Sequence, residues 1–175
     1  MKLKPIFFYT LITLIISCTT KDPNSTQKGE DILEDLEVET TEVVNLDLKY
    51  NDTIYVPIYS DIYVTSGNQT VLLAATLSIR NTSFSEKLFV STIDYYNTQG
   101  ELVRKYLDKP IVVNPMATVD YVIEKEDDTG GSGANFIITL SSDSYNVKPI
   151  IQAIMIGTEG NKGFAFTTEG YSIKK

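Results

Sequence analysis

Apolar and polar residues alternate along much of the chain after Ile54, and this pattern constrains the fold more than any other feature. It is clearest from Val71 to Ile79, where every second residue is apolar and, apart from Leu72, the residues between are small or polar. A period of two places the two sets of side chains on opposite faces of a β-strand. The segment therefore predicts a strand with one buried face.

Three further segments carry apolar residues at strand spacing. Residues 119–123 and 136–140 repeat the simple alternation, with Val119, Tyr121 and Ile123 in the first and Phe136, Ile138 and Leu140 in the second. Residues 150–156 are apolar on both sides of the alternation. Such double apolarity is typical of a strand with both faces covered, so we expect a central strand there.

Turn signals separate these segments at intervals of about 10 to 15 residues, and no long helical pattern follows residue 50. They lie at residues 66–68, 97–100, 114–115, 130–133 and 157–163. The fold class predicted is all-β, an antiparallel β-sandwich of about seven to nine strands, immunoglobulin-like in outline. A small closed β-barrel is the alternative.

The N-terminus resembles the lipobox region of bacterial lipoproteins. Lys2 and Lys4 precede an apolar stretch that ends at Ser17-Cys18, and Cys18 is the sole cysteine. The stretch is too short to span a bilayer, and Ile15 at position −3 does not suit an ordinary signal-peptidase site. We expect residues 1–17 to be a lipoprotein signal peptide and Cys18 to carry lipid, such as palmitate. This places the protein in the bacterial cell envelope, anchored to a membrane, with the outer membrane favoured.

The charge of the remaining chain bounds its partners. Without residues 1–17 the chain has 13 basic and 23 acidic residues, a net charge of 13 − 23 = −10. Nucleic acid selects basic surfaces, so no nucleic-acid partner is expected. Residues 18–50 read as an acidic flexible tether, with seven acids and no basic residue between Glu30 and Glu42. Residues 51–175 then form a single β-sandwich domain.

The residue types present disfavour most catalytic chemistry. The chain has no histidine, and lipidation would consume its one cysteine. Histidine-based triads, thiol nucleophiles and the common zinc sites are therefore excluded, and no cofactor is expected. A pair of carboxylates acting on a glycan stays possible, because such geometry is invisible in sequence.

The loop before the predicted strand at 136–140 is the most distinctive candidate for binding. Gly130, Gly131 and Gly133 allow close backbone approach, and Asn135 follows them. Glu126, Asp127 and Asp128 offer hard oxygens to Ca²⁺, although their spacing is not that of an EF-hand. A plain solvated connection is the alternative.

Four residues elsewhere are further candidates for contacting a ligand or partner. Arg80 ends its predicted strand and can bind an anion or pair with an acid on a neighbouring strand, such as Asp94. Tyr95 and Tyr96 next to Asp94 can form an aromatic recognition face, or can lie at the edge of the core.

Several segments together resemble an uncharacterised bacterial family, domain of unknown function 3124. They are YVPIYS (55–60), TLSIRNT (76–82), DYY (94–96), YL (106–107), GGSGANF (130–136) and MIGT (155–158). The likeness covers about residues 54–171 and implies one exported or lipid-anchored domain. No catalytic or binding residue is implied by it.

Two functional hypotheses follow. The first is a non-catalytic envelope lipoprotein whose β-sandwich binds a small ligand or a protein. The second is a carboxylate-based hydrolase acting on envelope glycan.

Overall fold

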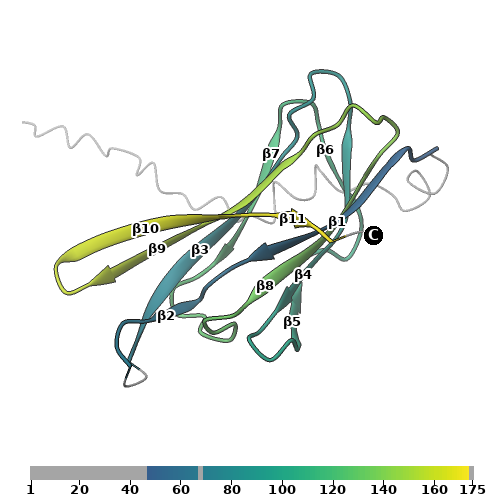
Figure 1. Cartoon of the computed structure of the whole chain (residues 1–175). Coiled ribbons are helices and arrows are strands. Elements are labelled where there is room, and N and C mark those ends of the chain that lie inside the picture. The colour runs from purple at the N-terminus through teal and green to yellow at the C-terminus, as the bar shows by residue number, and fades with distance from the viewer. Residues whose placement is uncertain (1–46, 67–68, 174–175) are drawn as a thin grey trace, which may run out of the picture.

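The computed structural model describes residues 47–66 and 69–173 of the 175-residue chain. These residues form eleven strands in two antiparallel sheets and contain no helix (Figure 1). The all-β prediction and the antiparallel sandwich are confirmed, and the sheets do not close into a barrel. The count exceeds the predicted seven to nine because four strands have only two to four residues.

The first sheet contains six strands in the order β11-β1-β8-β4-β5, with β6 also pairing with β4. Its strands are β1 (Tyr50–Pro57), β4 (Leu88–Tyr96), β5 (Leu102–Lys105), β6 (Ile111–Val113), β8 (Asn135–Ser142) and β11 (Tyr171–Ser172).

The second sheet contains five strands in the order β10-β9-β3-β2, with β7 also pairing with β3. Its strands are β2 (Asp61–Tyr63), β3 (Thr70–Arg80), β7 (Thr118–Ile123), β9 (Ile150–Glu159) and β10 (Lys162–Glu169). Both β2 and β7 pair with the edge of β3 that β9 leaves free, at opposite ends of that strand.

The core lies between the sheets and is built from the alternating residues. In β3 the buried set is Leu73, Ala75, Leu77 and Ile79, as predicted. The predicted inward sets of β7 and β8 are buried as well. Each alternating strand contributes one face to the core, so the period-two pattern accounts for the main layers.

The outer face of β9 departs from the expectation of a covered strand. β9 is central by pairing, since it lies between β3 and β10. Yet Ile150 and Ile156 are 45% and 54% exposed, because no third layer covers this face within the described residues. The apolar residues on that side of β9 therefore do not indicate burial.

A long hairpin formed by β9 and β10 extends past the rest of the second sheet (Figure 1). Glu159 and Lys162 close it across two loop residues, and Gly160 has φ +57°. A positive φ at the first loop position is typical of a type II′ turn, which matches the twist of the flanking strands.

The predicted signal peptide, Cys18 and residues 18–46 of the predicted tether lie outside the described residues. Within the described part of the chain there is no helix long and apolar enough to cross a bilayer.

Candidate functional site

A pocket of about 410 Å³ lies at the end of the sandwich where β2 meets the loop between β7 and β8. Four segments that are distant in sequence line it. They are Asp61 and Tyr63 of β2, Thr70 of β3, Thr98 and Gln99 of the β4–β5 turn, and residues 128–132. Most of these side chains are hydroxyls, amides or carboxylates, so the pocket is polar.

Thr98 ties the β4–β5 turn to the glycine-containing loop. Its backbone N–H donates to the carbonyl of Gly130 at 2.9 Å, and its hydroxyl donates to the same carbonyl at 3.0 Å. The hydroxyl also accepts a hydrogen bond from the N–H of Gly133 at 2.9 Å. One threonine thus fixes both ends of the Gly130–Gly133 turn.

Ser60 ties the same loop to the start of β2. The N–H of Gly131 donates to the Ser60 hydroxyl at 2.7 Å, and the N–H of Ser60 donates to the Gly131 carbonyl at 3.2 Å. Gly131 has φ +74°, a left-handed conformation that residues with a side chain adopt at a cost. The loop is therefore held on two sides in a shape that suits glycine.

Gly130 packs directly on Tyr95. A Cβ atom at position 130 would lie 1.7 Å from the Tyr95 hydroxyl oxygen, far inside contact distance. Tyr95 is fully buried, and its hydroxyl makes no hydrogen bond of good geometry in the described structure. Burial raises the pKa of Tyr95 to about 12, and the nearby Ser60 hydroxyl offsets only part of that rise. Tyr95 therefore lies in the core behind Gly130 as a neutral side chain.

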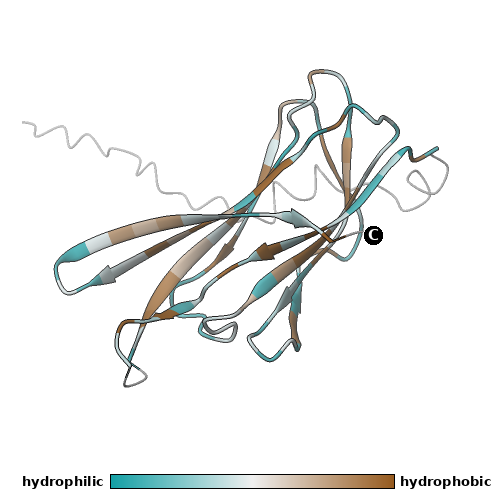
Figure 2. Cartoon of the chain, viewed as in Figure 1, coloured by the Kyte–Doolittle hydropathy of each residue, from teal (hydrophilic) through white to brown (hydrophobic). Residues whose placement is uncertain are grey.

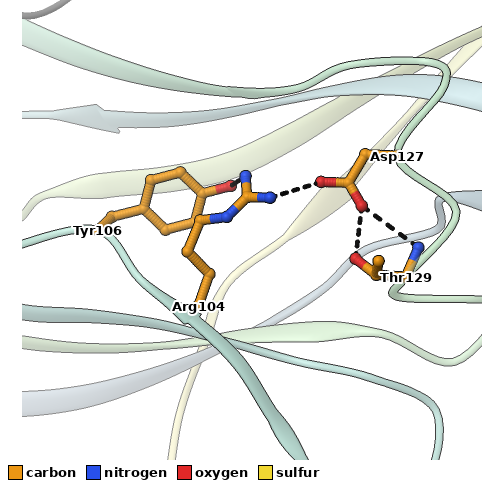
Figure 3. A network of polar contacts seen from close by, with 4 residues as sticks. All are labelled: Arg104, Tyr106, Asp127 and Thr129. Carbon is orange, nitrogen blue, oxygen red and sulfur yellow. Dashed lines mark hydrogen bonds and ion pairs between the residues drawn. The ribbon is translucent and has the colours of Figure 1, made fainter.

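A polar network braces the outer side of the loop (Figure 3). Arg104 donates to the Asp127 carboxylate at 2.8 Å and to the Tyr106 hydroxyl at 3.2 Å. The other Asp127 oxygen accepts from the backbone N–H and the hydroxyl of Thr129. Burial raises the pKa of Asp127, but the hydrogen bonds from Thr129 and Arg104 outweigh it and lower the pKa overall. Asp127 is thus held as a carboxylate that orders the loop.

Two carboxylates give the pocket its charge. Asp61 and Asp128 both line it, and none of the lining residues is a lysine or arginine. The pKa of Asp61 is raised, first by desolvation and then by the negative charge of Asp128. The two acids are therefore close enough to repel each other, and a bound cation would relieve that repulsion.

The structure brings most of the predicted site residues to this end of the sandwich. Gly130 and Gly131 line the pocket, and Gly133 lies beside them on Thr98. Asn135 begins β8 and is paired with Tyr96 of β4. Tyr95 is not part of an aromatic recognition face, because strand alternation turns it into the core against Phe136.

Arg80 lies apart from the pocket. It ends β3 beside Thr118 and Ile150, at the opposite end of the strand from Thr70. The predicted pairing with Asp94 is wrong, because Asp94 belongs to β4 of the other sheet, where its partners in register are Lys105 and Ile137.

The three acids considered for calcium do not converge. Asp127 faces Arg104 and Thr129, whereas Asp128 lines the pocket. Among the described residues no group of three or more acidic, histidine or cysteine side chains is placed to hold a metal ion.

Sequence reasoning missed the half of the pocket contributed by five residues, namely Asp61, Tyr63, Thr70, Thr98 and Gln99. Thr98 and Gln99 carried a signal only as part of a turn. Their role depends on contact between the β4–β5 turn and a loop some 30 residues further along, which is a tertiary feature that no local pattern reports.

Comparison with known proteins assigns the family. A search of curated proteins found no match to the chain. Among solved structures, the crystal structure of Thermotoga maritima 1070 is similar at 18% identity, covering 69% of this chain and 92% of its own, with a TM-score of 0.39. The family model described as protein of unknown function (DUF3124) matches residues 51–173, in agreement with the resemblance seen in the sequence. The chain therefore belongs to the DUF3124 family.

Proposed function

We propose that this protein is a membrane-anchored envelope lipoprotein whose β-sandwich binds a small, cationic ligand rich in hydrogen-bond donors, such as an amino sugar or a polyamine. The observation that carries the proposal is the polar pocket in which Asp61 and Asp128 lie together without a basic residue in the lining.

The lining offers mainly hydrogen-bond acceptors and negative charge. The two carboxylates supply charge, and the hydroxyls of Thr70, Thr129 and Ser132 supply adaptable polar contacts. Tyr63 is 61% exposed at the rim and can place its ring against a cation. Without residues 1–17 the chain has a net charge of 13 − 23 = −10, which adds a long-range attraction for cations.

The rigidity of the loop also favours binding. The Gly130–Gly133 turn is fixed by Thr98 on one side and by Ser60 on the other. A site that is ordered before the ligand arrives loses less conformational entropy on binding. This order supports a role in binding for the loop.

The anchored location rests on the N-terminal sequence. Lys2, Lys4, the apolar stretch and Cys18 form the arrangement of a lipoprotein signal, and the acidic residues that follow suit a spacer. On this proposal the domain meets its ligand outside the cytoplasm.

Calorimetric titration of the purified chain with spermidine and glucosamine, and with their uncharged or anionic counterparts, tests the ligand class. We expect heat of binding with the cations alone. Asp61→Asn and Asp128→Asn should each weaken binding at least about tenfold, because each removes one charge from the contact. The matched control is Asp120→Asn, on an exposed position of β7, which should bind as the wild type does. Equal binding by all four proteins would contradict the proposal.

A second candidate, the carboxylate-based hydrolase acting on envelope glycan, draws on the same pair of acids. A carboxyl group with a raised pKa beside a second acid is the arrangement of acid and partner in glycoside hydrolysis. Release of soluble glycan fragments from cell-wall material, lost in Asp61→Asn, would favour this candidate over simple binding.

A further inference from the structure

β10 presents a long strand edge without a partner. It spans eight residues, and β9 is its one strand partner in residues 47–66 and 69–173. Its register with β9 is continuous over all eight residues and contains no bulge. It contains no proline, and its two charged residues, Lys162 and Glu169, lie at its ends.

Other exposed edges in the described structure are blunted. β2, β6 and β11 have three, three and two residues. β5 has four, of which two are Arg104 and Lys105, and β7 has six, with the exposed Asp120 among them. Short length and charge are the devices by which proteins prevent unwanted pairing at sheet edges. β10 is long and has no charged residue along its middle, so we infer that its free edge pairs with another strand.

The alternation of the hairpin decides which backbone groups are free. Glu159 and Lys162 close a two-residue loop, so their backbone groups hydrogen-bond to each other. Every second pair further along the hairpin is hydrogen-bonded in the same way. The residues between, Gly163, Ala165 and Thr167, direct their N–H and C=O groups away from β9. All three are exposed and have small side chains, so another strand can approach closely.

We propose that β10 pairs antiparallel with β10 of a second copy of this chain, with Ala165 opposite Ala165 on the two-fold axis. This register joins free backbone groups of one copy to free groups of the other. It also sets Phe164 opposite Phe166 of the second copy, twice, at the closer, non-hydrogen-bonded pairs. Cross-strand aromatic pairs stabilise antiparallel sheets, and the strand is thus complementary to itself.

Shape and charge favour a second copy as the occupant. The β9–β10 hairpin extends past the rest of its sheet (Figure 1), which leaves its outer part clear for a second hairpin. Apolar residues run along the middle of β10, with polar ones at the hairpin tip (Figure 2). Two chains without residues 1–17, each of net charge 13 − 23 = −10, repel each other, whereas β10, with one Lys and one Glu, is neutral.

Disulfide trapping in membranes of cells that produce the full chain tests the register. Residues opposite each other at hydrogen-bonded positions have Cα atoms about 5.5 Å apart, within the range of a disulfide. Ala165→Cys should therefore give mostly cross-linked dimer on mild oxidation. Thr118→Cys, also exposed on a strand but on β7, is the matched control, and the wild type with Cys18 alone sets the background. Cross-linking of Ala165→Cys at the control level, or to a different protein, would overturn the proposal.

Sedimentation of the detergent-solubilised full chain provides a second measurement. We expect the wild type to have twice the protein mass of one chain. Ala165→Pro removes an outward N–H without breaking a bond to β9, so it should halve the mass and retain the β-sheet circular dichroism spectrum. A monomeric wild type, or a folded Ala165→Pro protein that stays dimeric, would refute self-pairing through β10.

Discussion

At the base of the pocket, Tyr95 fills the space that a side chain at position 130 would need. The Tyr95 hydroxyl lies where a side chain at position 130 would begin, and Ala134 lies 2.9 Å from that point on another side. Gly130→Ala should therefore lower the free energy of unfolding by about 1–3 kcal/mol, through overpacking. Urea denaturation measures this change.

Tyr95→Phe provides the control for that mechanism. It removes the hydroxyl, which is buried without a good hydrogen bond, and should itself change stability little. In the double variant it should restore part of the stability lost in Gly130→Ala, because the closest clash is gone. Additive effects of the two substitutions would show that the clash is not the cause.

Asp61 offers a prediction on pH. Desolvation and Asp128 raise its pKa in the folded state, so folding favours the protonated form. The free energy of unfolding should therefore fall as pH rises from the pKa of Asp61 in the unfolded chain through its pKa in the folded protein. A cationic ligand should dissociate as pH falls through the same range, because Asp61 then loses its charge. Carboxyl NMR titration should place the Asp61 pKa above its ordinary value and show it falling in Asp128→Asn, but not in Asp120→Asn.

For single residues, the sequence indicates which side chains and glycines could form a site, but not where the fold places them. The three glycines pointed to the loop that lines the pocket, because their backbone freedom is a local property of the sequence. Tyr95, by contrast, was a candidate for recognition and is buried, since a tyrosine on an alternating strand suits either face. Asp61 drew no attention because its significance comes from Asp128, 67 positions away.

Among the elements, the β4–β5 turn matters most for the pocket. Thr98→Val removes the hydroxyl that joins Gly130 and Gly133, leaving those groups with one partner fewer. We expect stability to fall by about 1–2 kcal/mol and amides of residues 130–133 to exchange faster with solvent. Hydrogen exchange measures the local effect.

Thr92→Val is the matched control for that substitution. Thr92 donates to the Thr139 hydroxyl at 3.0 Å in the middle of the first sheet. The same change of side chain there should leave exchange at residues 130–133 and ligand binding unaffected. Equal loosening of the loop in both variants would count against the role of Thr98.

Four of the longer strands followed from the sequence, whereas β1, β4, β10 and the short strands did not. β3, β7, β8 and β9 each carry three or more apolar residues at alternating positions, which is enough to define a period. β2, β6 and β11 are strands because each pairs with the edge of a longer strand. Their two or three residues are too few to show an alternation. The pairing of β2 and β7 along one edge of β3 is likewise set by the long-range topology.

For the whole molecule, the predicted anchor is the feature with the largest expected consequence. Cys18→Ser should move the protein from the membrane fraction to the soluble fraction or block processing, because acyl chains supply about 0.8 kcal/mol per buried methylene and the acidic chain has no attraction to anionic lipid. Fractionation with immunoblotting provides the measurement. Ser17→Ala, which keeps a small residue before the cysteine, should remain in the membrane.

The direction of β1 separates the point where the chain enters the domain from the pocket. The chain enters this strand at Tyr50 and leaves it at Pro57, just before Ser60 contacts the glycine loop. Eight residues of β-strand, about 26 Å in length, thus separate the entry point from the pocket end. In a domain held by its N-terminus, the pocket would lie at the end farther from the point of attachment, so the tether would not emerge beside the ligand.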